Sequence, residues 1–88
     1  MNIKIKPIEN QTFKSFEVEL QDIGWKKRCE LNDEMIKATS NGSNPSFSWW
    51  GGIVLKYTDL KESELNKYST DEIIGIAHAI FEAANKKK

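Results

Sequence analysis

The chain has 88 residues, a length that allows one small domain near the lower limit of what a single hydrophobic core can stabilise. Its 13 basic and 13 acidic side chains cancel, so no overall field would draw it to nucleic acid or to an acidic membrane. The one cysteine cannot form a disulfide within the chain, which is typical of a reducing compartment. No signal peptide and no apolar run long enough to cross a bilayer is visible, so we expect a soluble, cytoplasmic protein.

The first 21 residues predict a β-hairpin. Residues 3–8 alternate isoleucine with lysine until a proline interrupts them, which is typical of a short edge strand. Residues 16–21 alternate large apolar side chains with glutamate and glutamine, a clearer strand pattern. Pairing the two segments would place Lys4 and Lys6 near the glutamates of the second, and each such cross-strand pair contributes roughly 0.2–1 kcal/mol.

A helical pattern begins at residues 22–24 and is expected to end near Ser40, before an Asn-Gly pair that tolerates a left-handed helix cap. Its apolar side chains form two groups. The first group, which shares a face with Asn32, is Trp25, Cys29 and Ile36, and the second, on the flank of that face, is Leu31, Met35 and Ala38. We expect the charged remainder of this helix to face water.

The segment 47–57 fits two patterns. Its apolar residues make a helical stripe, but residues 53–57 would also suit a buried strand after the Gly51-Gly52 pair. Two glycines inside a helix cost about 1 kcal/mol each relative to alanine. Ser46 is well placed to cap a helix, and the neighbouring segments are helical, so we favour a helix and leave the strand as the alternative.

Two more helices are predicted in the last third of the chain. Asp59 to Glu62 has the spacing of a capping box and should start a short helix. Ser69 and Glu72 have the same spacing and should start a final helix over residues 70–86. The apolar stripe of this final helix is Ile73, Ile76, Ala77, Ile80, Phe81 and Ala84.

These elements predict the fold class. We expect a single small domain over residues 1–88 that is α+β and mostly helical. A short N-terminal β-hairpin, residues 1–21, should be followed by three to four packed α-helices in residues 22–88.

Residue chemistry offers no candidate for a catalytic or metal site. His78 is the only histidine, and the sequence provides it with neither a nucleophile nor converging metal ligands, so we expect a surface histidine. The acidic pairs at 33–34 and 62–64 lack the loop geometry of a calcium site. The glycines at 51–52 lack the rest of a phosphate-binding loop. We therefore expect no enzyme activity, no cofactor and no metal.

The Trp49-Trp50 pair is the strongest candidate for a binding site. Adjacent residues on a helix point about 100° apart, so one indole could enter the core while the other lies at the surface as a binding anchor. The alternative is that both indoles lie in the core. The candidate groove for a protein partner is Phe47, Trp49, Trp50, Ile53, Val54, Ile74 and Phe81. Residues 47–55 contain no lysine or arginine, which argues against single-stranded nucleic acid as the ligand.

Three segments follow one another in an order that a known family also shows. Residues 16–31 run from an extended segment into a helix that carries an arginine, and residues 58–65 supply a short middle helix. Residues 71–85 form a final helix rich in Ile, Ala and Glu that ends near an asparagine. In this order the chain resembles the tail assembly chaperones of long-tailed bacteriophages, which are small and mostly helical.

The resemblance implies a protein that coats the tape-measure protein in the host cytoplasm, keeps it soluble and helps to recruit tail-tube subunits. It also implies that the terminal lysines, residues 86–88, could mark a programmed frameshift. An apolar groove ringed by mixed charge would suit a long amphipathic helix. A small structural virion component (a head–tail or tail completion protein) and another phage protein-interaction module are the alternatives. Self-association of the chain is left open.

Overall fold

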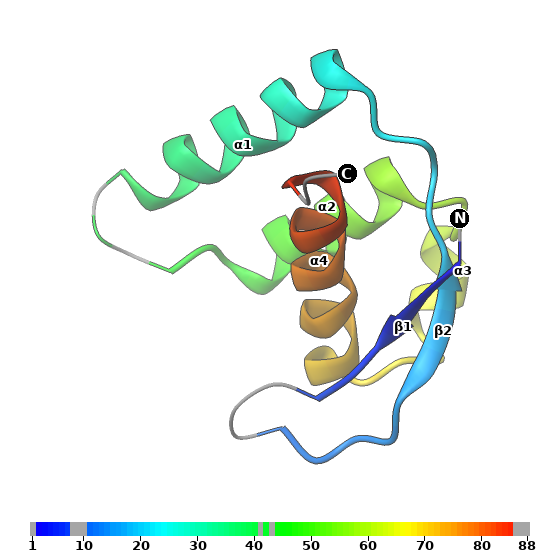
Figure 1. Cartoon of the computed structure of the whole chain (residues 1–88). Helices are drawn as coiled ribbons and strands as arrows, with labels where there is room; N and C mark the ends of the chain where they lie inside the picture. Colours follow the sequence, from blue (N-terminus) through cyan, green and yellow to red (C-terminus); the bar gives the residue numbers. More distant parts are fainter. Residues whose placement is uncertain (1, 8–10, 41, 43, 86–88) are drawn as a thin grey trace.

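The computed structural model of the chain describes residues 2–7, 11–40, 42 and 44–85 (Figure 1). Its elements, in chain order, are β1 (Asn2–Ile5), β2 (Phe16–Glu19), α1 (Trp25–Thr39), α2 (Phe47–Tyr57), α3 (Glu62–Leu65) and α4 (Thr70–Asn85). The two strands form an antiparallel hairpin and the helices follow it. This arrangement confirms the predicted fold class, α+β and mostly helical.

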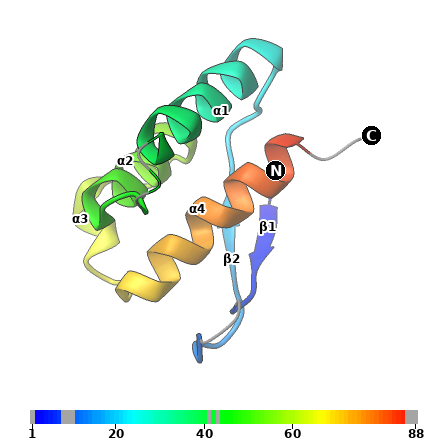
Figure 2. The same ribbon diagram turned by 90° about the vertical axis from the view of Figure 1, so that its left-hand side faces the viewer.

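Helix α4 lies at the centre of the molecule. Figure 2 shows it crossing between the hairpin on one side and helices α1 and α2 on the other. Its apolar stripe can therefore contact both sides. The buried apolar side chains form one cluster: Ile5, Val18, Leu20, Leu31, Trp50, Ile53, Val54, Tyr57, Ile76, Ala77, Ile80 and Ala84.

The hairpin has the predicted alternation. Lys4 lies opposite Glu17 on its exposed face, whereas Ile5 lies opposite Phe16 on the face that packs on the core. Lys6 follows the end of β1 and has no partner residue in the described ladder, and Ile8 of the predicted strand lies outside the described residues. Gly75 of α4 allows the hairpin to come close. A β-carbon there would lie 3.1 Å from the ring of Phe13, a tight contact.

The segment 47–57 is a helix, so the strand alternative is wrong. Its first turn is capped as predicted, because the backbone N–H of Trp49 donates to the Ser46 hydroxyl at 3.2 Å. The two glycines in this helix are not required by close contacts. A β-carbon on Gly51 would lie 3.9 Å from Leu65, and one on Gly52 would face open space.

The two predicted capping boxes have different outcomes. The Ser69 box is confirmed, because the Ser69 N–H donates to Glu72 Oε1 at 2.7 Å and the Glu72 N–H donates to Ser69 Oγ at 3.2 Å. The box at Asp59 is wrong. Helix α3 begins at Glu62, and the Asp59 carboxylate instead accepts from the side chain of Gln21 at 3.3 Å. The end of the final helix at Lys86 lies outside the described residues.

Helix α1 lies within the predicted bounds, and the structure shows which of its two apolar groups faces the core. Leu31 is fully buried, and Met35 packs against the core. Trp25 and Ile36, which belong to the other apolar group, are 71% and 67% exposed. Helical spacing sets the angle between two apolar groups on a helix, but it does not say which of them the remaining chain will cover.

Candidate functional site

Four rings from helices α2 and α4 lie in contact at one surface. We call Trp49, Trp50, His78 and Phe81 the aromatic cluster. The two indoles meet edge to face, with ring centroids 5.0 Å apart. Trp49 also stacks on Phe81 at 6.3 Å, and Trp50 lies 4.9 Å from the imidazole of His78. Such aromatic pairs each contribute about 0.5–1.5 kcal/mol beyond the area they bury.

The two tryptophans of the cluster differ in burial. Trp50 is 8% exposed and belongs to the core, whereas Trp49 and Phe81 are half-buried and pack only at its edge. Phe47, one turn before Trp50 on α2, is 68% exposed. The structure therefore separates the two indoles, with Trp50 as a core residue and Trp49 at the surface.

Of the residues predicted to contact a partner, two are buried and a third, Trp50, is largely buried. Ile53 and Val54 are 2% and 0% exposed, so their side chains offer no surface to a partner. Trp50 is nearly as well covered and can present only its edge. The physical reason is the helical stripe of α2, which turns these side chains with Tyr57 towards the core. Ile74 is half-buried at the border of the core.

His78 is a member of the cluster that the sequence placed on a solvated face. Its ring is exposed to solvent on one side and lies against Trp50 on the other. Partial burial lowers the pKa of His78 below its ordinary value of 6.5, because desolvation disfavours the charged ring. His78 lies four residues after Ile74 and three residues before Phe81. This spacing could have indicated that the three side chains share one helical face.

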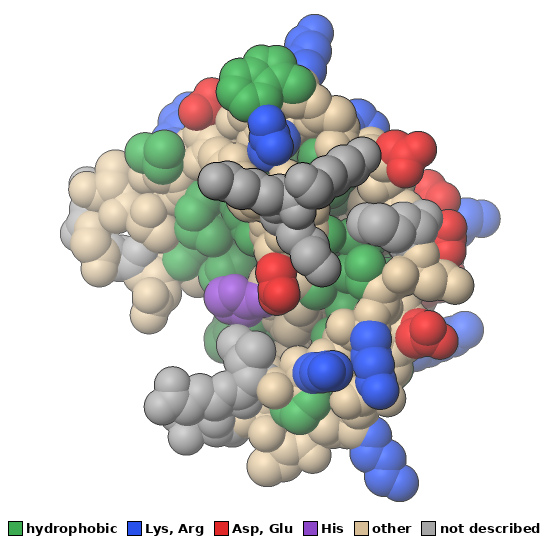
Figure 3. Space-filling view, viewed as in Figure 1, with side chains coloured by type: hydrophobic (Ala, Val, Ile, Leu, Met, Phe, Trp, Pro, Cys, Tyr) green, Lys and Arg blue, Asp and Glu red, His purple; other side chains and the backbone are tan. Residues whose placement is uncertain are grey.

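Figure 3 shows hydrophobic side chains gathered around His78 at the middle of this face of the molecule. The apolar area is bordered by side chains of both signs. Such a border is typical of a protein-binding surface, which has an apolar centre and a polar rim.

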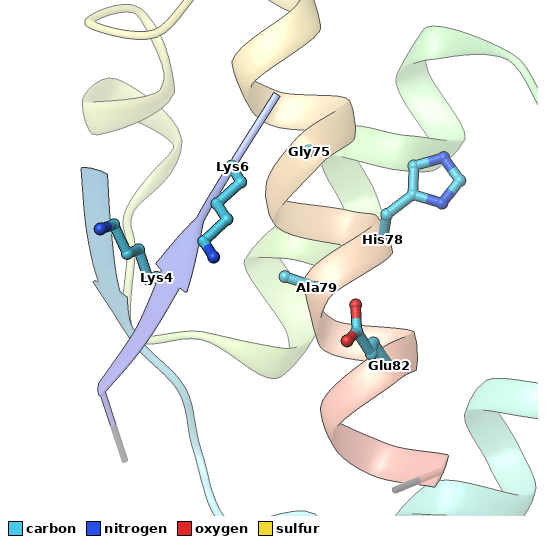
Figure 4. A pocket seen from close by; sticks show the side chains of 6 residues that line it. All are labelled: Lys4, Lys6, Gly75, His78, Ala79 and Glu82. Carbon is cyan, nitrogen blue, oxygen red and sulfur yellow. The ribbon is translucent and has the colours of Figure 1, made fainter. Parts of the chain in front are cut away.

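A pocket of about 340 Å³ lies next to the cluster, between the β1 segment and α4 (Figure 4). Lys4 and Lys6 line it from the strand side, and His78 and Glu82 line it from the helix. Gly75 and Ala79 form its floor on α4. Two lysines and one glutamate line the pocket, so their charges cancel only in part.

Within residues 2–7, 11–40, 42 and 44–85, no group of three or more His, Cys, Asp or Glu side chains could hold a metal ion. Across the same part of the chain, every helix is too short or too polar to cross a membrane.

Comparison of the chain with models of protein families, with curated proteins and with solved structures found no match. Function therefore has to be inferred from the exposed side chains and their surroundings.

Proposed function

We propose that this chain is a non-enzymatic binding module that holds an amphipathic helix of a partner protein against the aromatic cluster. The observation that carries this proposal is the exposure of large rings at a packed helix–helix junction. Phe47 is mostly exposed, and Trp49 and Phe81 are half-buried although they stack on one another. Rings that are fixed in place and still accessible are the usual anchors of protein interfaces.

The expected binding is weak at each contact. Burying one exposed phenylalanine or tryptophan side chain contributes about 1.5–3 kcal/mol, so two or three anchors would give only modest affinity. A long partner that repeats the same apolar pattern would be bound by many copies in turn. Weak, sequence-tolerant contacts of this kind keep a partner soluble without capturing it permanently.

We further propose that the partner is the tape-measure protein of a bacteriophage tail, met in the host cytoplasm, and that tail-tube subunits are recruited to the same complex. Support for this partner comes from the order of segments that resembles the tail assembly chaperones. A long helical, apolar protein is also the kind of target that a row of partly exposed aromatic rings would suit.

Co-expression with a tape-measure protein tests the proposal directly. We expect the wild-type chain to raise the soluble fraction of that protein, and Trp49→Ala or Phe81→Ala to abolish most of the increase. Tyr68→Ala is the matched control, because Tyr68 is a half-buried ring that stacks on Phe16 away from the cluster. Thermal melts would verify that all variants fold. Equal solubilisation by wild type and both cluster variants would contradict the proposal.

Analysis of purified phage particles separates the proposal from the virion-component alternative. An assembly chaperone should be absent from the finished particle. Finding the chain there in fixed stoichiometry would replace the proposed function with a permanent structural role.

A further inference from the structure

Helix α1 exposes a second apolar surface that is distinct from the aromatic cluster. Trp25 and Ile36 are 71% and 67% exposed, and Cys29 is half-buried between them on the same side of the helix. We call these three residues the α1 stripe. The stripe points roughly a third of a turn away from Leu31, the side chain that faces the core. Figure 3 shows separate hydrophobic groups at the outer edge of this part of the molecule.

The monomer holds α1 with few contacts. Leu31 is its one buried residue among 15. Three polar links add to it: the hydrogen bonds between the Asn32 and Asn85 amides, an ion pair between Glu34 and Lys56, and a hydrogen bond from Lys27 Nζ to Gln21 Oε1 at 3.2 Å. A helix of about this length is marginal in water without tertiary packing. A second packing surface on the α1 stripe would stabilise it.

The charges along α1 are divided in a way that suits a second copy of the same helix. Its first turn holds Lys26, Lys27 and Arg28 and has no acidic residue, an unfavourable order for the helix dipole. The acidic residues Glu30, Asp33 and Glu34 follow in the next turns. A parallel copy would set lysine against lysine. An antiparallel copy would bring carboxylates to the basic first turn and would also oppose the two dipoles.

We propose that two copies of this chain associate through their α1 stripes, with the helices antiparallel about a two-fold axis near Glu30 and Leu31. In this arrangement Trp25 of each copy packs on Ile36 of the other, and Cys29 lies close to the axis. Lys26 and Asp33 lie on the same flank of the stripe, so each Lys26 meets Asp33 of the other copy. The aromatic cluster is not part of this surface, and a dimer would present two clusters to one long partner.

Sedimentation equilibrium of the purified chain tests the pairing. A single pair of helices is at the small end of stable interfaces, so we expect a dimer with a dissociation constant on the order of micromolar. Ile36→Asp should weaken the dimer by about tenfold or more, because it places a charge in the apolar centre. Trp49→Ala should leave the dimer unchanged. A wild-type chain that stays folded and monomeric at high concentration would overturn the inference.

Charge reversal provides the more specific test. Lys26→Glu alone and Asp33→Lys alone should each weaken the dimer by about fivefold, since two symmetric ion pairs are replaced by two repulsive pairs. The double variant should regain the wild-type dissociation constant. Circular dichroism would show that the monomer is folded in each case. Failure of the double variant to recover, with folding intact, would overturn the proposed register.

The single cysteine gives a third measurement without any substitution. A short bismaleimide should join Cys29 of the two copies in the folded wild type and much less in Ile36→Asp. Equal cross-linking in both would count against the α1 pairing. If Ile36→Asp instead lost the solubilisation of the partner and kept the dimer, the α1 stripe would belong to the partner, and the inference would be wrong while the binding function stood.

Discussion

The two exposed apolar surfaces of this protein have opposite origins. The aromatic cluster is the outer border of the junction where α2 lies on α4, with Val54 and Ile80 fully enclosed and Trp50 nearly so. The α1 stripe lies on a helix with one buried residue, Leu31, and is turned away from the core. A large exposed apolar side chain therefore has different structural surroundings in the two places. In the first it extends the packed core, and in the second it lies on a face that the described chain leaves mostly open, with only the Arg28 guanidinium over the Trp25 ring at 4.7 Å.

This difference predicts where truncation will be most damaging. Ile80→Ala should lower the free energy of unfolding by about 2–5 kcal/mol, because it opens a cavity under α2 at a fully buried position. Ile36→Ala on the α1 stripe should change it by less than about 0.5 kcal/mol when measured on the monomer. Urea denaturation at low protein concentration would compare the two. Equal losses would mean that α1 is held far more firmly than its contacts indicate.

Replacing Gly52 should change the free energy of unfolding by a smaller amount and in the opposite direction. It is exposed in the middle of α2, and an added β-carbon would meet nothing. Gly52→Ala should therefore raise the free energy of unfolding by about 1 kcal/mol through better helix propensity. The control is Gly75→Ala, which should destabilise, because its β-carbon would crowd Phe13 and Ile5 at 3.1 and 3.2 Å. If Gly52→Ala folded more stably but captured the partner less well, the partner would approach α2 closely at this point.

The third prediction is a pH dependence of the folding stability that arises from His78 in the aromatic cluster. Burial lowers the pKa of His78, so the unfolded chain binds a proton more readily than the folded one. The contribution of the neutral ring to stability is present above pH 6.5 and declines as the pH falls below that value. His78→Gln should reduce this decline by a small amount. Urea midpoints of both proteins between pH 7.5 and 5 would show it, and parallel curves would contradict it.

Much of this fold could be predicted because local signals and the final packing agree. The alternation in β1 and β2, the caps at Ser46 and Ser69 and the stripe of α4 are each set by residues a few positions apart. The Asp59 box failed although its spacing was right. The side chain of Gln21, distant in sequence, donates to that carboxylate, and Thr58 Oγ1 accepts from the N–H of Leu60.

The candidate site was harder to predict for a related reason. Phe47, Trp49 and Phe81 were recognised as candidates, but nothing local showed that Ile53 and Val54 would be covered completely. Local sequence was equally unable to show which side of α1 would be covered. Its two apolar groups differ by a rotation of the helix, and only the position of α4 decides which one is buried.

The tryptophan side chains allow the two surfaces to be compared in one experiment. The chain has three tryptophans, and each indole N–H gives its own signal in a ¹⁵N correlation spectrum. On addition of an amphipathic helical peptide from a tape-measure protein, we predict that the Trp49 signal shifts strongly and the Trp25 signal stays in place. A shift of Trp25 without one of Trp49 would contradict the assignment of partner binding to the aromatic cluster.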